Sequence, residues 1–316
     1  MALVARLRSY ATLVSFTHTI FALPFAASAV VLALAMPHPP LTATRVLAML
    51  ICMVSARTSA MAFNRWADRD IDAKNPRTAS RPIQRGDVRP REALALTVAS
   101  AAVFVFSAST LGTAPAILAL PVLAVLLGYS YAKRFTWAAH AWLGVALALA
   151  PGGAWLAVGA PVVWGIVALM AAVVTWLLGF DVLYSLQDEG FDREARLHSI
   201  PSRFGAARSL AASAVSHLVT VFSLALTGAL LHRGTVYFVG VSIVAALLVW
   251  EHMLLHPPID AAQRGGNGPG SAPPRVATSR WARADLSKID KAFFDLNAWI
   301  SVGFFVATLV DEIVRR

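Results

Sequence analysis

Two short segments of the chain concentrate the side chains best suited to binding a metal ion, and each lies at the end of a long apolar stretch. The first, N-R-W-A-D-R-D-I-D, contains Asn64, Asp68 and Asp72. The second, D-V-L-Y-S-L-Q-D-E-G-F-D, contains Asp181, Asp188 and Asp192. Steps of four residues place side chains on one face of a helix, and a step of seven falls on the same stripe. We therefore expect each segment to present its polar side chains together.

Carboxylates stacked in this way repel one another, by about 1 kcal/mol per pair at ~4 Å in water and by several times more at a lower dielectric. A cation between the two segments would reverse this repulsion. Neither segment contains His or Cys at metal-ligand spacing. Oxygen ligands alone suit Mg²⁺, which favours a few carboxylates together with phosphate oxygens. The alternative is that each segment is the solvated charged end of a helix, but its occurrence at two matching positions favours a metal.

A basic loop that contains proline follows each acidic segment. The first loop reads A-K-N-P-R-T-A-S-R-P-I-Q-R-G and the second R-E-A-R-L-H-S-I-P-S-R-F-G. Carboxylates for a metal beside Arg and Lys for an anion are the combination that binding of a metal diphosphate requires. Neither half contains a glycine-rich phosphate loop, which argues against a nucleotide-binding fold.

The apolar stretches predict the fold class. Hydrophobic residues make up 58% of the chain and charged residues only 14%, far from the composition of a soluble domain. Runs of about 20 apolar residues, each long enough to cross the hydrocarbon core, recur along the chain. They predict an all-α polytopic membrane protein with about nine transmembrane helices, at 18–36, 43–63, 92–111, 113–130, 138–158, 162–182, 206–231, 234–256 and 292–312. Pro115, Pro121 and Pro151 interrupt two of these runs, although membrane helices tolerate proline when neighbouring groups satisfy the backbone.

The net charge of +10 is distributed unevenly, and its placement predicts orientation rather than binding of nucleic acid. Most of the 27 Lys and Arg residues fall in loops on the same side as the N-terminus. The exceptions are Arg45, Arg233, Arg315 and Arg316 on the other side and Arg57 within a span. The positive-inside rule then places both acidic segments on the cytoplasmic face. The lipid bilayer is the expected environment, and anionic lipids or substrates are further candidates for the basic loops.

The chain is expected to form a single integral-membrane domain over residues 1–316. Within it, the Gly- and Pro-rich stretch 257–284 has the composition of a flexible cytoplasmic linker. The single cysteine, Cys52, lies within a predicted span, so a disulfide framework is excluded.

The two acidic segments and their loops resemble those of the UbiA superfamily of intramembrane prenyltransferases. The first matches the pattern N-x-x-x-D-x-x-x-D followed by K-N-P-R-T-x-x-R-P, and the second matches D-x-x-Y-x-x-x-D-x-x-x-D. Y-S-Y-A-K-R, residues 129–134, lies where the family carries a Tyr and a basic loop between its fourth and fifth helices. The resemblance implies a nine-helix bundle around a central cavity roofed by the cytoplasmic loops. It also implies Mg²⁺-dependent transfer of an isoprenoid chain from its diphosphate to an acceptor, often an aromatic one.

Shorter motifs are similar to the 4-hydroxybenzoate polyprenyltransferase branch. They are F-T-H-T-I-F-A-L-P-F (16–25), Q-D-E-G-F-D-R (187–193), L-H-S-I-P-S-R-F-G (197–205) and D-L-S-K-I-D-K-A-F-F (285–294). Some members of the subgroup they resemble act on 1,4-dihydroxy-6-naphthoate in the futalosine route to menaquinone. The implied reaction is transfer of a polyprenyl chain to 4-hydroxybenzoate or 1,4-dihydroxy-6-naphthoate, in ubiquinone or menaquinone biosynthesis at a bacterial inner membrane. Transfer to another acceptor is the alternative within the family.

The resemblance also implies roles for individual residues. The expected metal ligands are Asn64, Asp68, Asp72, Asp188 and Asp192. The four aspartates among them, together with Asp181, are the catalytic candidates, and Asn64 is also a substrate-binding candidate. Candidates for binding the diphosphate are Lys74, Arg77, Arg81, Lys133, Arg134 and Arg193. Tyr131, Tyr184 and His198 are further substrate-binding candidates. For each cation the alternative is a plain topology charge, and for His198 it is a loop turn before Pro201.

Two charges lie deeper in the predicted spans. Asp181 could orient Tyr184, bind a second metal, help to deprotonate the acceptor, or be a buried hydrogen-bonded carboxylate. Because a lone Asp costs ~2.5–3.5 kcal/mol in lipid, it should face the bundle interior. Arg57, seven residues before Asn64, could bind an acceptor carboxylate or a diphosphate oxygen. The alternative for Arg57 is an internal salt bridge to Asp181.

A cation transporter is the alternative from another functional class. It would require carboxylates near the bilayer midplane and helices interrupted there. Here the acids cluster at the helix ends and are followed by basic loops, which favours the enzyme. A CDP-alcohol phosphotransferase would require a D-G-x-x-A-R-type sequence, which this chain lacks.

Overall fold

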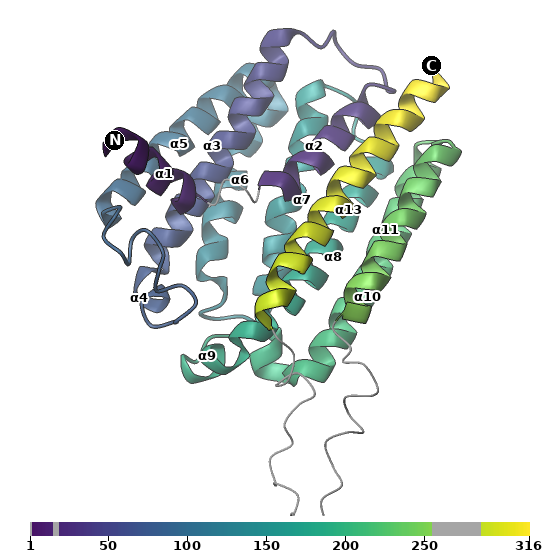
Figure 1. Cartoon of the computed structure of the whole chain (residues 1–316). Helices are drawn as coiled ribbons and strands as arrows, with labels where there is room; N and C mark the ends of the chain where they lie inside the picture. The colour runs from purple at the N-terminus through teal and green to yellow at the C-terminus, as the bar shows by residue number, and fades with distance from the viewer. Residues whose placement is uncertain (1, 15–18, 255–285) are drawn as a thin grey trace, which may run out of the picture.

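The computed structural model describes residues 2–14, 19–254 and 286–316. Those residues form helices and connecting turns without any β-strand, which confirms the all-α prediction. The expected linker 257–284 lies outside the described residues. Figure 1 shows the long helices gathered into one bundle, with the C-terminus at the end away from the short helices α4 (Arg69–Asp72) and α9 (Glu189–Glu194).

Eight helices in the described part of the chain are long and apolar enough to cross a membrane. They are α3 (Ala43–Ala67), α5 (Pro90–Leu111), α6 (Thr113–Ala132), α7 (Ala139–Val158), α8 (Trp164–Ser185), α10 (Ile200–Leu230), α11 (Thr235–Leu254) and α13 (Leu286–Arg315). The shorter apolar helix α2 (Thr19–Ala33) occupies the first predicted span. Together these helices account for the nine predicted spans. The N-terminal helix α1 (Ala2–Leu13) was not expected from the sequence.

Proline does not end the helices in the interrupted runs. Pro121 lies inside α6 and Pro151 inside α7, and both helices continue through. Helix α10 has a different irregularity at Gly205, whose backbone is non-helical with φ 79°. Glycine adopts positive φ without the steric penalty of other residues. The kink separates a short entry turn from the long helix, which continues from the predicted start at residue 206.

Helix α8 is the central helix of the bundle, packing between α7 and α10. Glycines make both contacts close. A Cβ on Gly144 of α7 would lie 2.5 Å from the carbonyl oxygen of Val174, and one on Gly179 of α8 would lie 2.4 Å from the ring of His217. Small residues of this kind let membrane helices approach closely.

A buried polar chain joins α8, α11 and α13. Trp176 donates its indole N–H to Asn297 at 2.9 Å, and Asn297 donates to the carboxyl of Glu251 at 2.8 Å. Glu251 is fully buried. Because polar groups buried in an apolar medium are costly unless hydrogen-bonded, these contacts specify how the three helices align.

The outer-side arginines of the sequence analysis have structural partners. Arg45 donates to the carbonyl oxygens of Leu111 and Ala157, at the carboxyl ends of α5 and α7. Arg233 forms buried ion pairs with Asp311 at 3.1 Å and Glu312 at 2.7 Å. A cation near helix carboxyl ends is also favoured by the helix dipole. These charges therefore stabilise the end of the bundle opposite α4 and α9.

Candidate active site

Each acidic segment runs across the end of a long helix. Helix α3 stops at Ala67, and Asp68 has φ −93° and ψ 5° before α4 begins. After α8, a single 3₁₀ turn at Leu186–Asp188 leads into α9. Each segment is therefore not one continuous helix as expected, although Asn64 and Asp68 still lie side by side, joined by a hydrogen bond of 2.8 Å. Asp and Asn side chains compete with the helical backbone for hydrogen bonds, which is consistent with breaks at these residues.

Both segments lie at one end of the bundle, the end of α4 and α9 (Figure 1). Arg77, in the loop after α4, holds Asp188 of the second segment through two contacts. Its Nη2 lies 2.5 Å from Oδ2, and its Nε donates to Oδ1 at 3.0 Å. Asn75 donates to the same Oδ1 at 3.2 Å. The first loop thus reaches across to the second acidic segment.

The acids of the first segment contact Asn64 of the same segment and two arginines from the loops. Asn64 donates its amide N–H to Asp68 at 2.8 Å, and Arg134 pairs with the other oxygen of Asp68 at 3.1 Å. Arg81 pairs with Asp72 at 2.6 Å. Burial raises the pKa of the Asp68 carboxyl above its ordinary value, and the hydrogen bond from Arg134 opposes that rise.

Asp192 of the second segment is buried and faces Lys133, whose Nζ lies 3.7 Å from Oδ2. That oxygen is buried and accepts no hydrogen bond within the described residues. The backbone carbonyl of Lys133 accepts a hydrogen bond from the N–H of His198 at 2.7 Å. The loop between α6 and α7 is therefore tied to the loop after α9.

The four acids Asp68, Asp72, Asp188 and Asp192 thus each face a different cation from the loops. Those cations, in the same order, are Arg134, Arg81, Arg77 and Lys133. Buried charges are tolerated when paired in this way. All four cations were expected to bind the diphosphate, and the structure places them directly against the expected metal ligands. The region therefore presents interleaved negative and positive groups.

The two expected tyrosines support arginines of this network. Tyr184 accepts a hydrogen bond from Arg77 at 2.9 Å, and the guanidinium carbon lies 5.2 Å from its ring centre. The guanidinium carbon of Arg134 lies 4.8 Å from the ring centre of Tyr131. Cation–π contacts of this type hold a guanidinium in a fixed orientation.

The remaining candidates lie at the margins of the network. Lys74 is exposed in the first loop. Arg193 is exposed and pairs with Glu189 at 2.8 Å, one turn away on α9, which is the kind of surface pair that contributes little stability. His198 is half-buried. Arg57 is half-buried within α3, two turns before Asn64.

Asp181 lies within α8 and has a partner that the sequence analysis did not single out. The Nδ1 of His140, on α7, lies 2.6 Å from its Oδ2. Asp181 therefore forms a hydrogen bond with His140. His140 and Asn75 are two residues of this region that were not predicted from the sequence. The available signal for His140 was an ionisable side chain at the start of an apolar run, a position that suggests function in a membrane protein.

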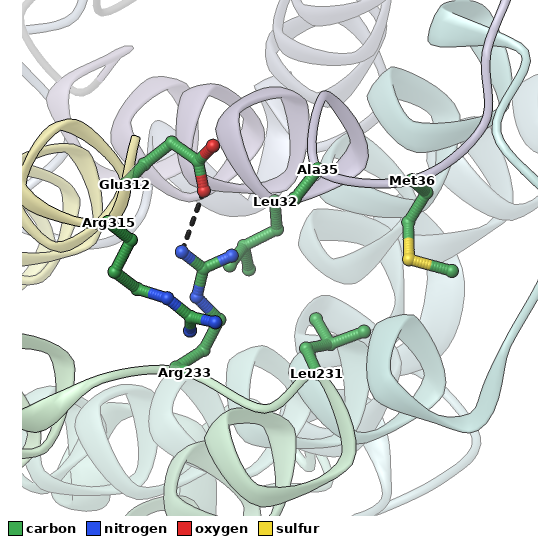
Figure 2. A pocket seen from close by; sticks show the side chains of 7 residues that line it. All are labelled: Leu32, Ala35, Met36, Leu231, Arg233, Glu312 and Arg315. Atoms are coloured by element: carbon green, nitrogen blue, oxygen red, sulfur yellow. Dashed lines mark hydrogen bonds and ion pairs between the residues drawn. The ribbon is translucent and has the colours of Figure 1, made fainter.

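A cavity of about 250 Å³ at the other end of the bundle is a separate feature (Figure 2). Figure 2 shows Arg233 and Glu312 joined as an ion pair beside Arg315. Leu32, Ala35, Met36 and Leu231 form the rest of the lining. Arg233 pairs with Glu312 and Arg315 pairs with the neighbouring Asp311, so we assign the cavity no part in the chemistry.

Residues 22–264 match the UbiA prenyltransferase family. The chain belongs to this family. The resemblance noted from the acidic segments is thereby confirmed, and the chain is a prenyltransferase rather than a transporter.

Curated relatives of this UbiA family member include two bacterial enzymes named 4-hydroxybenzoate octaprenyltransferase. The one from Nitrosospira multiformis is 24% identical over 83% of this chain and 81% of its own length. The one from Aromatoleum aromaticum is 26% identical over 82% and 79%.

Solved structures of other family members have the same fold. A UbiA homologue from Aeropyrum pernix K1 is 31% identical and covers 93% of this chain and 98% of its own, with a TM-score of 0.76. A UbiA homologue from Archaeoglobus fulgidus, solved with GPP and Mg²⁺ bound, is 18% identical and covers 96% and 99%, with a TM-score of 0.62. The nine-helix expectation agrees with this fold.

Proposed function

We propose that this prenyltransferase moves a polyprenyl chain from polyprenyl diphosphate to an aromatic acid, 4-hydroxybenzoate or 1,4-dihydroxy-6-naphthoate, with Mg²⁺. We further propose that it does so at the cytoplasmic face of a bacterial inner membrane, for ubiquinone or menaquinone synthesis. The observation that carries this proposal is the interleaving of four carboxylates with four loop cations, with Arg77 bridging both segments. A metal diphosphate offers positive and negative groups in the same alternation. The names of the curated relatives support the aromatic acid.

The residues present fit a magnesium ion. Their donors are oxygens only, and the Asp192 Oδ2 is buried without a hydrogen-bond donor in the described part of the chain. Among the described residues, no three His, Cys, Asp or Glu side chains converge as ligands of one ion. Each ion would therefore be held by one or two carboxylates and completed by phosphate oxygens and water, which is the arrangement Mg²⁺ favours. Asn64, Asp68, Asp72, Asp188 and Asp192 are the proposed ligands.

When bound, Mg²⁺ would neutralise the charge that develops on the departing diphosphate. Arg77, Arg81, Lys133 and Arg134 already lie against the acids, and their proposed role is to bind diphosphate oxygens. Arginine suits this role because its planar fork matches two phosphate oxygens at once. Tyr184 and Tyr131 hold two of these arginines in position. Lys74, Arg193 and His198 would assist at the exposed margin.

The acceptor is proposed to bind deeper than the diphosphate. Arg57 lies two turns before Asn64 on α3. Asp181, near the end of α8, lies about two turns before Asp188. Two turns of helix correspond to about 10 Å along the axis. An aromatic acid between them would present its carboxylate to Arg57 and its ring to Asp181.

One assay separates this proposal from the alternatives. Membranes containing the protein receive a polyprenyl diphosphate with Mg²⁺ and either 4-hydroxybenzoate or 1,4-dihydroxy-6-naphthoate, and the product is identified by mass. A prenylated acid that forms only with the complete mixture supports the proposal. Absence of product with both acids, but product formation with another aromatic acceptor, would assign the chain to a different branch of the family.

A further inference from the structure

His140 makes two polar contacts from a position with no solvent exposure. It lies at the start of α7 and faces two other elements. Its Nδ1 is 2.6 Å from the carboxylate of Asp181 on α8, and its Nε2 is 3.2 Å from the backbone nitrogen of Ile200, where α10 begins. An imidazole buried this completely must have both ring nitrogens satisfied.

The second contact determines which nitrogen carries the proton. The backbone N–H of Ile200 can only donate, so Nε2 of His140 must be the acceptor. In the neutral ring the proton is then on Nδ1, where it is donated to Asp181. The start of α10 therefore selects the tautomer that supports the carboxylate. Support of one side chain through the far nitrogen of a histidine is a common arrangement in active sites.

We infer that His140 is a positioning residue that orients Asp181 to accept the proton of the aromatic acceptor, an inference that rests on the proposed function. In that reaction the C1–O bond of the prenyl diphosphate breaks and the diphosphate leaves with the electron pair. A ring carbon of the acceptor uses its π electrons to form the new C–C bond. The proton on that carbon passes to the carboxylate of Asp181, and the C–H electron pair restores the aromatic ring. No oxidant or reductant is needed.

The role of His140 differs from that of the charged groups around Asp181. Lys133 and Arg77, two cations from the loops, act electrostatically on Asp181. These groups provide electrostatic stabilisation at longer range. His140 is in direct hydrogen-bonding contact and therefore fixes which way the carboxylate points. Asp181 retains 17% exposure of its side chain, so it is not sealed by its partner.

Two replacements of His140 distinguish this role from a purely structural one. The amide nitrogen of Asn stands close to the position of Nδ1, whereas the terminal amide of Gln stands close to Nε2. His140→Asn should therefore keep the donor toward Asp181, and His140→Gln should keep only the contact with Ile200. We expect His140→Asn to retain kcat within a few-fold and His140→Gln to lose about tenfold or more, since small misplacements of a reacting group have such effects. The KM for the prenyl diphosphate should stay unchanged in both.

His217→Asn is the matched control, because it also removes a buried imidazole but at the contact between α8 and α10. Its kcat should be unchanged. Thermal unfolding in detergent is measured for every variant, so that loss of folded protein is not scored as loss of turnover. A further test adds His140→Gln to Asp181→Asn, where it should lower kcat no further because the residue it positions is already altered.

The opposite order of the two variants, with His140→Gln active and His140→Asn impaired, would overturn the inference and assign His140 to support of α10. Wild-type turnover in both variants would overturn it as well, and so would an additive loss in the double variant. In each of these cases the wild-type enzyme still prenylates the acid, so the proposed function stands. Failure of the wild-type enzyme to prenylate either acid would instead remove the proposed function and this inference together.

Discussion

Arg77 and Asp188 form a two-pronged ion pair between segments that lie 111 residues apart in the sequence. The contacts measure 2.5 Å and 3.0 Å, and the same guanidinium donates to the hydroxyl of Tyr184. One side chain thus connects the loop after the first acidic segment with both the second segment and α8. Its geometry depends on a planar fork that only arginine provides.

Replacing Arg77 with Lys should therefore weaken both the fold of this region and binding of the prenyl diphosphate. An ammonium retains the charge but not the second contact, and the Arg77 side chain is 33% exposed. We expect a loss of about 1–3 kcal/mol in substrate binding, roughly ten- to hundredfold in KM for the diphosphate. Arg85→Lys is the control, because its pair with Asp87 is at the surface and should contribute little. Equal KM values for the two variants would show that the fork is not used.

Removal of divalent metal should abolish turnover, and Mg²⁺ should restore it. Asp68→Ala should lose at least ~3 kcal/mol of transition-state stabilisation, roughly a hundredfold in rate. Asp70→Ala is the control within the same segment, because Asp70 is exposed and pairs only loosely with Arg69 at 3.6 Å. Full activity in EDTA, or normal turnover of Asp68→Ala, would contradict a metal held by these acids.

Arg57 should act on the acceptor. If it binds the carboxylate of the aromatic acid, Arg57→Ala should raise the KM of the acid by roughly ten- to hundredfold, the equivalent of about 1.5–3 kcal/mol for a charge-assisted hydrogen bond. Arg57→Lys should restore little, because an ammonium lacks the two-pronged contact. Steady-state kinetics with each substrate varied in turn provide the measurement. A rise in the diphosphate KM with an unchanged acceptor KM would place Arg57 in the diphosphate site instead.

The two ends of the bundle should lie on opposite sides of the membrane, with the acidic segments inside. Cys52 is the only cysteine, so Cys52→Ala provides a background for labelling with a membrane-impermeant thiol reagent. In intact cells Pro40→Cys, in the exposed loop before α3, should react. Asp87→Cys, in the exposed loop before α5, should react only after the membrane is permeabilised. Labelling of Asp87→Cys in intact cells would show that the acidic segments lie on the outer side of the membrane.

The sequence by itself determined the positions of the spans and the residues of both acidic segments. About 20 consecutive apolar residues match the thickness of the hydrocarbon core, and this is a local property of the sequence. The apolar runs therefore predicted α3, α5, α6 and the later spans despite Pro121 and Pro151. The motif residues were recognisable for a similar reason, because their types and spacing are local.

Only the tertiary structure decided which of those residues meet. The pairing of Arg77 with Asp188, and of Lys133 with Asp192, depends on how helices distant in the sequence pack. Gly144 and Gly179 allow α7 and α10 to approach α8 closely, but no local pattern encodes which helices meet. His140 is the clearest case, because a lone histidine in an apolar run shows no partner until α7, α8 and the start of α10 come together. The breaks at Asp68 and Asp188 were missed for a related reason, since regular spacing predicts a continuous helix and the backbone departs from it there.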